Sequence, residues 1–371
     1  METEMRTAAI WQGVISDAEY FGRFARDLQD CTDDFLSSVI AFCMVPYFSL
    51  AMHESLQKLE DISPGISSEI TSETLAVSAR SRHSLKLFED TQRGINGQIS
   101  YFRDEIFTAH SEAFLGNTWL PLARPFETDL GLYSYGRRLI STTHAATFHL
   151  GFEPRKALAV DSDTYFRETF REYGAFFGSL GADLNDPGPD TFFKSLRYSE
   201  LSDRDVRARR YYRRVFNGRE TPEINATLTT FQALLNFGNL VLTSAIDRQR
   251  VDYTDFKIAY LCLYQVLRSL QILLNDGTYG LTDLSAATAS SIVNMEAAQT
   301  IMKRGAKPFR NTLMHYNLPP SVAMSRVDLS QPFFGLVPIY FPQHDAASFI
   351  EMVHQCGTAT SAMLDKWGGE H

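Results

Sequence analysis

Most of this chain repeats its apolar residues at intervals of three and four, the spacing that puts them on one face of an α-helix. Few segments alternate apolar and polar residues as a half-buried strand does. The pattern therefore predicts an all-α fold. The expected helices cover 8–29, 33–61, 66–113, 134–152, 163–179, 202–216, 222–248, 254–275, 284–304, 308–316 and 345–367.

Helix-start and turn signals divide the chain into regions. Thr32-Asp33-Asp34 and Thr221-Pro222-Glu223 are typical helix starts, and 117–127, with two prolines, is a connection. We predict a helical N-terminal region (1–126), a helical middle region ending in an Arg/Tyr-rich helix (127–220) and a C-terminal bundle of four to five helices (221–371). In that bundle the helical period lapses over 319–343, where the aromatic run 333–341 is compatible with a short hairpin.

Composition limits the classes of function. The chain has 371 residues, of which 44% are hydrophobic and 21% charged, enough for a sizeable core. Its net charge of −9 argues against nucleic acid covering the whole surface, but it leaves room for a local basic site.

The cysteines and the N-terminus bear on the compartment. The cysteines show no zinc-binding spacing and are expected to be free thiols in a reducing compartment; they are Cys31, Cys43, Cys262 and Cys356. The acidic N-terminus is unlike a signal peptide. The apolar stretch 35–52 is interrupted by polar residues and is too amphipathic for a membrane span. We therefore expect a cytoplasmic protein.

The strongest candidate for chemistry is a six-residue motif near the end of the chain. It reads Arg310-Asn311-Thr312-Leu313-Met314-His315 and follows Pro308, which favours a helix start. On a helix Asn311 and His315 share a face, and Arg310 lies roughly 140° around the axis from His315. Its long side chain can still reach the same phosphate.

These residue types suit cleavage of an RNA phosphodiester by its own 2′-hydroxyl. Histidine exchanges protons near neutral pH, and arginine, always charged, binds phosphate through two nitrogens. Asparagine can orient the imidazole or bind a phosphate oxygen. The start of the helix favours an anion, and three further basic residues gather there as RNA-binding candidates: Lys303, Arg304 and Lys307.

The motif resembles the signature of the HEPN superfamily, in which four to six residues separate an arginine from a histidine and asparagine often follows the arginine. The resemblance covers the motif and its helical context, 221–371. It implies a helical bundle, usually a homodimer or higher oligomer, with metal-independent ribonuclease activity at the subunit interface and no cofactor. Carried over, Arg310, Asn311 and His315 are catalytic. Tyr316 stands where family members often have a small residue.

The resemblance also implies a biological role. Related proteins are toxins or effectors of bacterial anti-phage defence, in abortive infection or toxin–antitoxin pairs, and they cleave RNA such as tRNA or mRNA under control of an antitoxin or sensor. The chain would cut RNA to leave a 2′,3′-cyclic phosphate. No membrane partner is expected.

Two other interpretations remain open for the motif. His315 can instead be a satisfied core histidine and Arg310 a surface ion-pair former, or the bundle can be a non-catalytic module that binds RNA or protein or mediates dimerisation. Arg103 with His110 and Arg138 with His144 also match the bare arginine-to-histidine spacing, and we interpret them as ordinary helix residues.

An arginine-rich stretch precedes the bundle, with tyrosines among the arginines. Such interleaving is typical of single-stranded RNA binding, through phosphate contacts and base stacking. The candidates are Arg207, Arg210, Tyr211 and Arg214. The alternative is a solvated helix paired to nearby acids such as Glu200, Asp203, Asp205 and Glu220.

Overall fold

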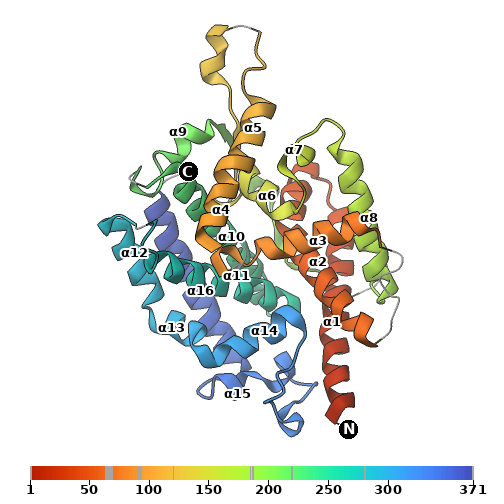
Figure 1. Ribbon diagram of the computed structural model, residues 1–371. Helices are drawn as coiled ribbons and strands as arrows, with labels where there is room; N and C mark the ends of the chain where they lie inside the picture. The colour runs from red at the N-terminus through yellow and green to blue at the C-terminus, as the bar shows by residue number, and fades with distance from the viewer. Residues whose placement is uncertain are drawn as a thin grey trace.

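The computed structural model describes residues 2–62, 70–89, 94–119, 121–183, 185, 188–218, 220–279 and 281–369. It is 73% helical, with one small sheet, so the predicted all-α class is confirmed (Figure 1). Parts of two predictions, 66–69 and 90–93 of the helix at 66–113 and Arg219 of the arginine-rich stretch, lie outside the described residues.

Two long helices form the centre of the molecule. In α10 (Pro222–Asp247) the Thr221 side chain accepts a hydrogen bond from the amide of Ile224, and Pro222 opens the first turn. A short connection leads to α11 (Tyr253–Leu274). Both helices are buried around most of their circumference, because other helices cover them on several sides.

The surrounding helices come from both ends of the chain (Figure 1). One side is formed by α1 (Glu2–Gln29), α2 (Asp34–Ile62), α3 (Ser72–Ser84) and α8 (Ser162–Ser179). The other is formed by α12 (Asp283–Val293), α13 (Glu296–Met302) and α16 (Ala346–Gly368). The predictions for 8–29, 33–61, 163–179 and 345–367 each match one of these helices, whereas 284–304 is divided into α12 and α13.

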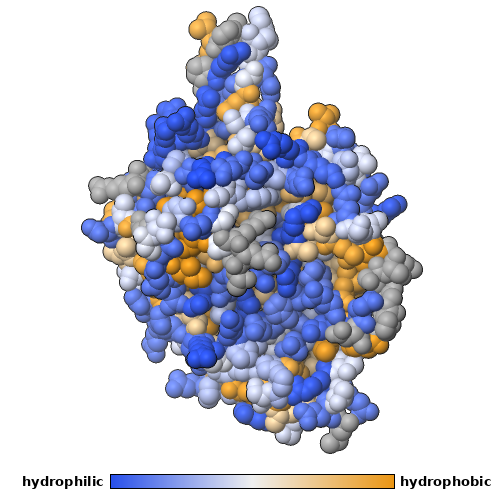
Figure 2. Space-filling view, viewed as in Figure 1, coloured by the Kyte–Doolittle hydropathy of each residue, from blue (hydrophilic) through white to orange (hydrophobic). Residues whose placement is uncertain are grey.

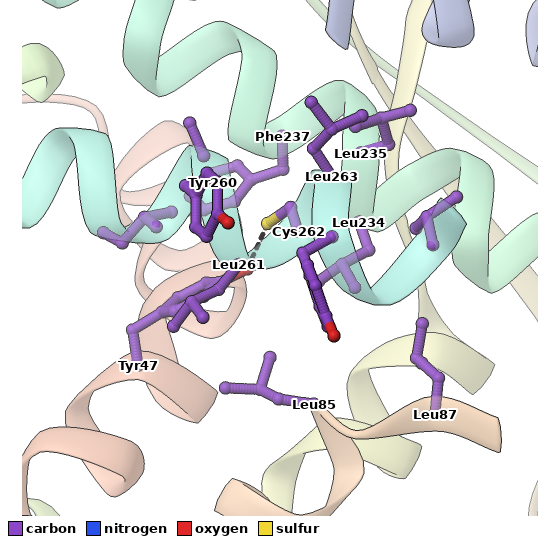
Figure 3. Close-up of a cluster of buried hydrophobic side chains, with 14 of the residues drawn as sticks. Tyr47, Leu85, Leu87, Leu234, Leu235, Phe237, Tyr260, Leu261, Cys262 and Leu263 are labelled. Atoms are coloured by element: carbon purple, nitrogen blue, oxygen red, sulfur yellow. Dashed lines mark hydrogen bonds between the residues drawn. The ribbon is translucent and has the colours of Figure 1, made fainter. Parts of the chain in front are cut away.

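The main hydrophobic core joins all three predicted regions. One cluster of buried side chains runs from Ala9 in α1 to Trp367 in α16. Figure 3 shows part of this cluster, to which α2 contributes Tyr47 and α10 contributes Phe237. The rings of these two residues stack with their centres 6.4 Å apart. The Tyr47 hydroxyl lies 2.7 Å from the Cys262 sulfur. The proposed boundary at 220/221 is therefore a break between helices and not a break in packing.

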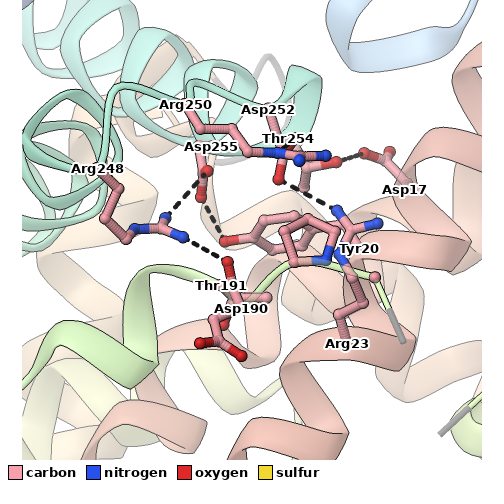
Figure 4. A network of polar contacts seen from close by, with 12 residues as sticks. Asp17, Tyr20, Arg23, Asp190, Thr191, Arg248, Arg250, Asp252, Thr254 and Asp255 are labelled. Carbon is pink, nitrogen blue, oxygen red and sulfur yellow. Dashed lines mark hydrogen bonds and ion pairs between the residues drawn. The ribbon is translucent and has the colours of Figure 1, made fainter. Parts of the chain in front are cut away.

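Polar contacts fix α1 against the start of α11 (Figure 4). The Tyr20 hydroxyl donates to Asp255 over 2.5 Å, and Arg23 pairs with Asp252 at 3.1 Å. Asp255 is fully buried, and this burial raises the pKa of its carboxyl to about 7. The N-terminal helix is thus built into the C-terminal half of the molecule.

The middle region contains strands where we expected helices. β1 (Leu130–Tyr135) pairs antiparallel with β2 (Arg138–Thr142) and with β3 (Leu201–Val206), in the order β2-β1-β3. Helix predictions over 134–152 and 202–216 are therefore wrong in part: only α6 (Thr143–Leu150) and the short α9 (Ala208–Tyr212) are helical there. α7 (Pro154–Ala157) follows α6.

The predicted helix 66–113 is a series of shorter elements. After α3 come a 3₁₀ turn (Leu87–Glu89), α4 (Gly94–Tyr101), a π-helical turn (Phe102–Ile106) and α5 (Phe107–Phe114). Beyond α5 an arm projects from the body, and hydrophobic atoms lie along it in Figure 2. Exposed apolar side chains of this arm are Phe114, Trp119, Leu122 and Phe126.

The aromatic run 333–341 forms part of the core and not a hairpin. It contains a 3₁₀ turn (Pro332–Gly335) and α15 (Val337–Tyr340). The Phe341 ring stacks 4.1 Å from Phe349 of α16. The expected hairpin is wrong because these rings cover the helices beneath them and pair with no neighbouring strand.

Within the described ranges, α2 is long and apolar enough to cross a membrane by length and composition. Its apolar window lies within Asp34–Glu60, and 61% of that window is buried in the protein. Contacts with α1, α3 and α6 account for that burial, so the hydrophobicity of α2 has an explanation inside the fold.

Candidate functional site

The motif forms its own helix, as predicted. α14 (Lys307–His315) has Pro308 in its first turn and ends at Tyr316, whose backbone is left-handed (φ 51°). Phe309 is fully buried and packs edge-on against Phe349. This hydrophobic anchor fixes which way the polar side chains of α14 point.

Arg310 points inward, to a carboxylate. Its side chain is 6% exposed and pairs with Glu89 at 3.0 Å. A second nitrogen donates to the Asn311 amide oxygen at 3.0 Å, and the guanidinium lies 5.3 Å from the centre of the Tyr264 ring. Arg310 is therefore neutralised by Glu89 and is not open to solvent in this conformation.

His315 points to a different carboxylate, as expected for a residue 140° around the helix from Arg310. Its Nδ1 lies 2.7 Å from Glu54 Oε2, and the His315 side chain is 26% exposed. Its Nε2 has no hydrogen-bond partner in the described part of the chain. A carboxylate at Nδ1 selects the tautomer with hydrogen on that nitrogen and leaves Nε2 to accept a proton.

Glu54 is the buried centre of this arrangement. It also receives the Arg82 guanidinium, with Arg82 Nε at 2.5 Å. Burial alone would raise the pKa of the Glu54 carboxyl, but hydrogen bonds and charge from His315 and Arg82 outweigh it and lower the pKa to about 2. Glu54 is thus ionised at neutral pH.

A second imidazole lies beside this pair. His53 of α2 is half-buried and near enough to Arg82 and His315 for their charges to act on it. Burial, and then the charge of Arg82, lower the pKa of His53 to about 4. His53 is therefore neutral at pH 7, and one chain holds two imidazoles near the same carboxylate.

Asn311 does not form a hydrogen-bonded bridge between Arg310 and His315. Its amide accepts from Arg310, and within the described ranges no hydrogen bond joins it to His315. Asn311 and His315 share a helix face as expected, but the group that orients His315 is Glu54.

Tyr316, the departure from the family pattern, is buried in a polar network. Its hydroxyl donates to Asp17 of α1, and Lys257 of α11 lies 2.5 Å from the same carboxylate. The Lys257 ammonium also lies 4.3 Å from the centre of the Tyr316 ring. The residue after the motif thus ties α14 to the first helix of the chain.

The predicted RNA-binding residues fall on two separate surfaces. Lys303, Arg304 and Lys307 are exposed at the start of α14, and Lys303 lies 4.9 Å from the centre of the Phe341 ring. The others line a cavity of about 630 Å³ at β3 and α9: Arg207, Arg210, Tyr211 and Arg214.

Tyr211 differs from the role predicted for it. Its side chain is 7% exposed and belongs to the main core, so its ring is closed to a stacked RNA base. The arginines around it are exposed. The alternation of arginine and tyrosine here reflects a short helix with one core face and one solvent face.

The two other arginine–histidine matches are structural. His110 and His144 are buried with ring centres 4.3 Å apart. Burial lowers the pKa of both imidazoles, that of His110 to about 4. They are neutral core residues, although Arg138 lies on a strand and not on the helix that we expected.

Sequence reasoning missed Glu54, His53, Arg82 and Glu89. All four come from the N-terminal region, more than 200 residues before the motif. One signal was available: Glu54 lies one helical turn after Leu50 and Ala51 in a strongly apolar segment, and a charged residue that continues such a face is buried only with a partner. Within the described residues no group of three or more histidines, cysteines or carboxylates is arranged to hold a metal ion.

Comparisons with protein-family models, curated proteins and solved structures find no match to this chain. The similarity to the HEPN superfamily therefore rests on the motif and its helical context alone.

Proposed function

We propose that this chain is a metal-independent endoribonuclease of the HEPN type, with His315 as its proton-transfer group. The observation that carries the proposal is the 2.7 Å contact between His315 Nδ1 and the buried Glu54 carboxylate. A carboxylate that orients imidazole and compensates its charge is a recurring arrangement in general acid–base catalysis. A histidine that only filled the core would not need an exposed ring nitrogen.

The proposed reaction uses the nucleophile that RNA carries. The 2′-hydroxyl loses its proton to one imidazole and attacks phosphorus; the 5′-oxygen leaves with a proton from the other. The products are a 2′,3′-cyclic phosphate and a 5′-hydroxyl. His315, whose Nδ1 faces Glu54 and whose Nε2 can accept a proton, would take one of these roles, and His53, neutral at pH 7, would take the other.

Arg310 would bind the scissile phosphate, with Asn311 positioning it. In the conformation described, the Glu89 carboxylate is paired with the Arg310 guanidinium. An RNA phosphate must therefore replace this carboxylate in order to bind Arg310. The replacement keeps one negative group beside Arg310 but breaks the contact between α14 and the 3₁₀ turn at Glu89. The basic residues at the start of α14, Lys303, Arg304 and Lys307, would guide RNA to this end of the helix.

The biological setting follows the resemblance. We propose a cytoplasmic toxin or effector of anti-phage defence that acts on tRNA or mRNA, as a homodimer or higher oligomer, with an antitoxin or sensor as partner. Growth arrest on expression of the wild type, with survival on expression of His315→Ala, would support that role.

The direct test is cleavage of a labelled RNA panel, tRNA included, in EDTA. We expect His315→Ala to lower the rate by about 10²–10⁴, the usual contribution of general acid–base catalysis, and Glu54→Gln to lower it less. His344→Ala is the matched control, because His344 is also half-buried but lies outside the site. Circular dichroism should show each variant folded.

Two results would contradict this mechanism. One is cleavage by folded His315→Ala at the wild-type rate. The other is strict dependence on a divalent metal with 3′-hydroxyl products.

A non-catalytic RNA- or protein-binding or dimerisation module is the second candidate, and the burial of Arg310 against Glu89 favours it. In that case Arg310 serves stability alone. Arg310→Met combined with Glu89→Gln removes both charges and should then leave RNA binding and oligomeric state unchanged, with no cleavage by any variant. If the wild type cleaves RNA and this folded double variant does not, the catalytic proposal gains support.

A further inference from the structure

The arginine-lined cavity at β3 and α9 has the features of a ligand site separate from α14. It holds about 630 Å³, within the range of pockets that bind small molecules and cofactors. Its walls come from the base of the arm, β3, α9 and the end of α16. In Figure 1, α9 and α14 lie in different parts of the molecule, so the cavity is remote from His315.

Four arginines line this cavity. They are Arg204, Arg207, Arg210 and Arg214, and all four residues are exposed. No carboxylate of the described residues forms an ion pair with any of them. Arg207 makes a single 3.4 Å hydrogen bond, to the backbone oxygen of Arg124. The alternative that this stretch is paired to nearby acids is therefore wrong for these four arginines.

Two carboxylates also line the cavity, Glu127 and Asp205. Glu127 accepts hydrogen bonds from the backbone amides of Gly116 and Thr118 at 2.8 and 3.0 Å. These bonds lower the pKa of its carboxyl to about 2. They also hold the carboxylate against the backbone of the arm. Among the described residues that line it, four arginines outnumber two carboxylates. This lining is basic, in a protein whose net charge is −9.

The cavity also offers apolar surface beside the arginines. The ring of Phe126 is 83% exposed at its edge, and Val206, Tyr211 and Val215 form part of its wall. An exposed aromatic ring next to guanidinium groups suits a nucleobase joined to phosphates, since the base can stack while arginines bind phosphate oxygens. Figure 2 shows hydrophilic side chains over the neighbouring surface of α9.

We propose that this cavity binds a ribonucleotide, with its phosphates on Arg204, Arg207, Arg210 and Arg214 and its base on Phe126. Two sources share this chemistry: a strand of RNA and a free nucleoside triphosphate. The binding is independent of the proposed cleavage at His315, because no residue of that site lines the cavity.

The test is equilibrium binding by fluorescence polarisation with two probes, a labelled 2′-O-methyl oligoribonucleotide, which lacks the nucleophile for cleavage, and a fluorescent ATP analogue. We expect Arg207→Glu/Arg210→Glu to weaken binding of at least one probe by about tenfold or more. The control Arg167→Glu/Arg171→Glu makes the same charge change at exposed arginines of α8 and should change affinity less than about threefold.

The salt dependence of binding and two further variants, His315→Ala and Phe126→Ala, test which groups contact the ligand. If RNA is the ligand, the slope of log affinity against log salt should fall by about 0.7 for each arginine–phosphate interaction that the double variant removes. His315→Ala should bind as the wild type does, whichever way the cleavage test turns out. Phe126→Ala should weaken both the nucleotide and the RNA if the base stacks there.

Each outcome is informative. Loss of RNA binding alone identifies an RNA strand as the ligand, and loss of triphosphate binding alone identifies a free nucleotide. The proposal is overturned if neither probe binds the wild type, or if the two double variants weaken binding equally.

Discussion

Glu54 pairs with both His315 and Arg82, so the ionisation of its carboxyl should affect the stability of the protein. The pKa of its carboxyl falls from 4.5 to about 2 in the folded protein. A lowered carboxyl pKa stabilises the fold above the unfolded value and loses that effect as pH falls through the folded value. At about 1.4 kcal/mol per pKa unit, the full effect is on the order of 3 kcal/mol.

We therefore predict that Glu54→Gln lowers the free energy of unfolding at pH 7 by about 3 kcal/mol, in part because Arg82 keeps a buried charge without its partner. The gap to the wild type should shrink as pH drops from 4.5 towards 2. Urea unfolding at pH 7 and pH 3.5 measures both values. An equal gap at the two pH values would show that the fold does not lower the pKa of the Glu54 carboxyl.

At the residue scale, the sequence could identify the motif but not its environment. Helical spacing correctly separated Arg310 from His315 around the axis. It could not identify Glu54 or Glu89 as the partners of these residues, because contacts between residues 261 and 221 positions apart leave no local pattern in the sequence. The burial of Arg310 could not be predicted for the same reason, because the acid that pairs with it comes from a distant segment.

At the scale of elements, the contact between α1 and α11 should respond to pH in the opposite direction from Glu54. Asp255 has a pKa of about 7 in the fold, raised by burial from 3.8. The folded state therefore holds a proton that the unfolded state has released, and this contribution to stability declines as pH rises from 3.8 to 7.

Asp255→Asn keeps an acceptor for the Tyr20 hydroxyl but cannot ionise. Between pH 5 and pH 8, the wild type should lose on the order of 2 kcal/mol relative to Asp255→Asn. Guanidinium unfolding of both proteins across this range checks the prediction. A constant difference between them would mean that the folded-state pKa of Asp255 is near its ordinary value.

Elements with strong helical period were predicted within a few residues, and the strands were missed. β1 and β2 are joined by Gly136 and Arg137, both with positive φ (54° and 66°). A two-residue hairpin loop of this kind usually carries Asn-Gly, and Gly-Arg gave no such signal. β3 is exposed along most of its length, so it lacks the alternation of buried residues that marks a strand.

At the scale of the whole molecule, the three predicted regions should not fold separately. An isolated 221–371 would leave Lys257 without Asp17 and Arg310 without Glu89. It would also expose to water the apolar faces of α10 and α11 that β2, the 3₁₀ turn at Leu87–Glu89 and α1 cover in the full chain. We predict that this fragment shows no cooperative thermal transition by circular dichroism, whereas the full chain does.

The reverse result, a sharp thermal transition for 221–371 alone, would show that the C-terminal bundle is an independent domain.

Turn signals at 217–222 correctly located the start of α10, yet a turn does not reveal whether packing continues across it. That information lies in the shared core between α2, α10 and α11, where apolar faces from both halves of the chain meet.

The docking of α1 also sets the order of events on the ribosome. Asp17 and Tyr20 meet their partners in α11 and at Tyr316, which follow them by 235 to 299 residues. At about 5–20 residues per second, the first helix waits on the order of 10–60 s before those partners are synthesised. Throughout that interval α1 can pack against α2 and α8, which are made earlier. The polar groups that face α11 and Tyr316 wait without partners, so the last step in assembling α14 is its attachment to the first helix of the chain.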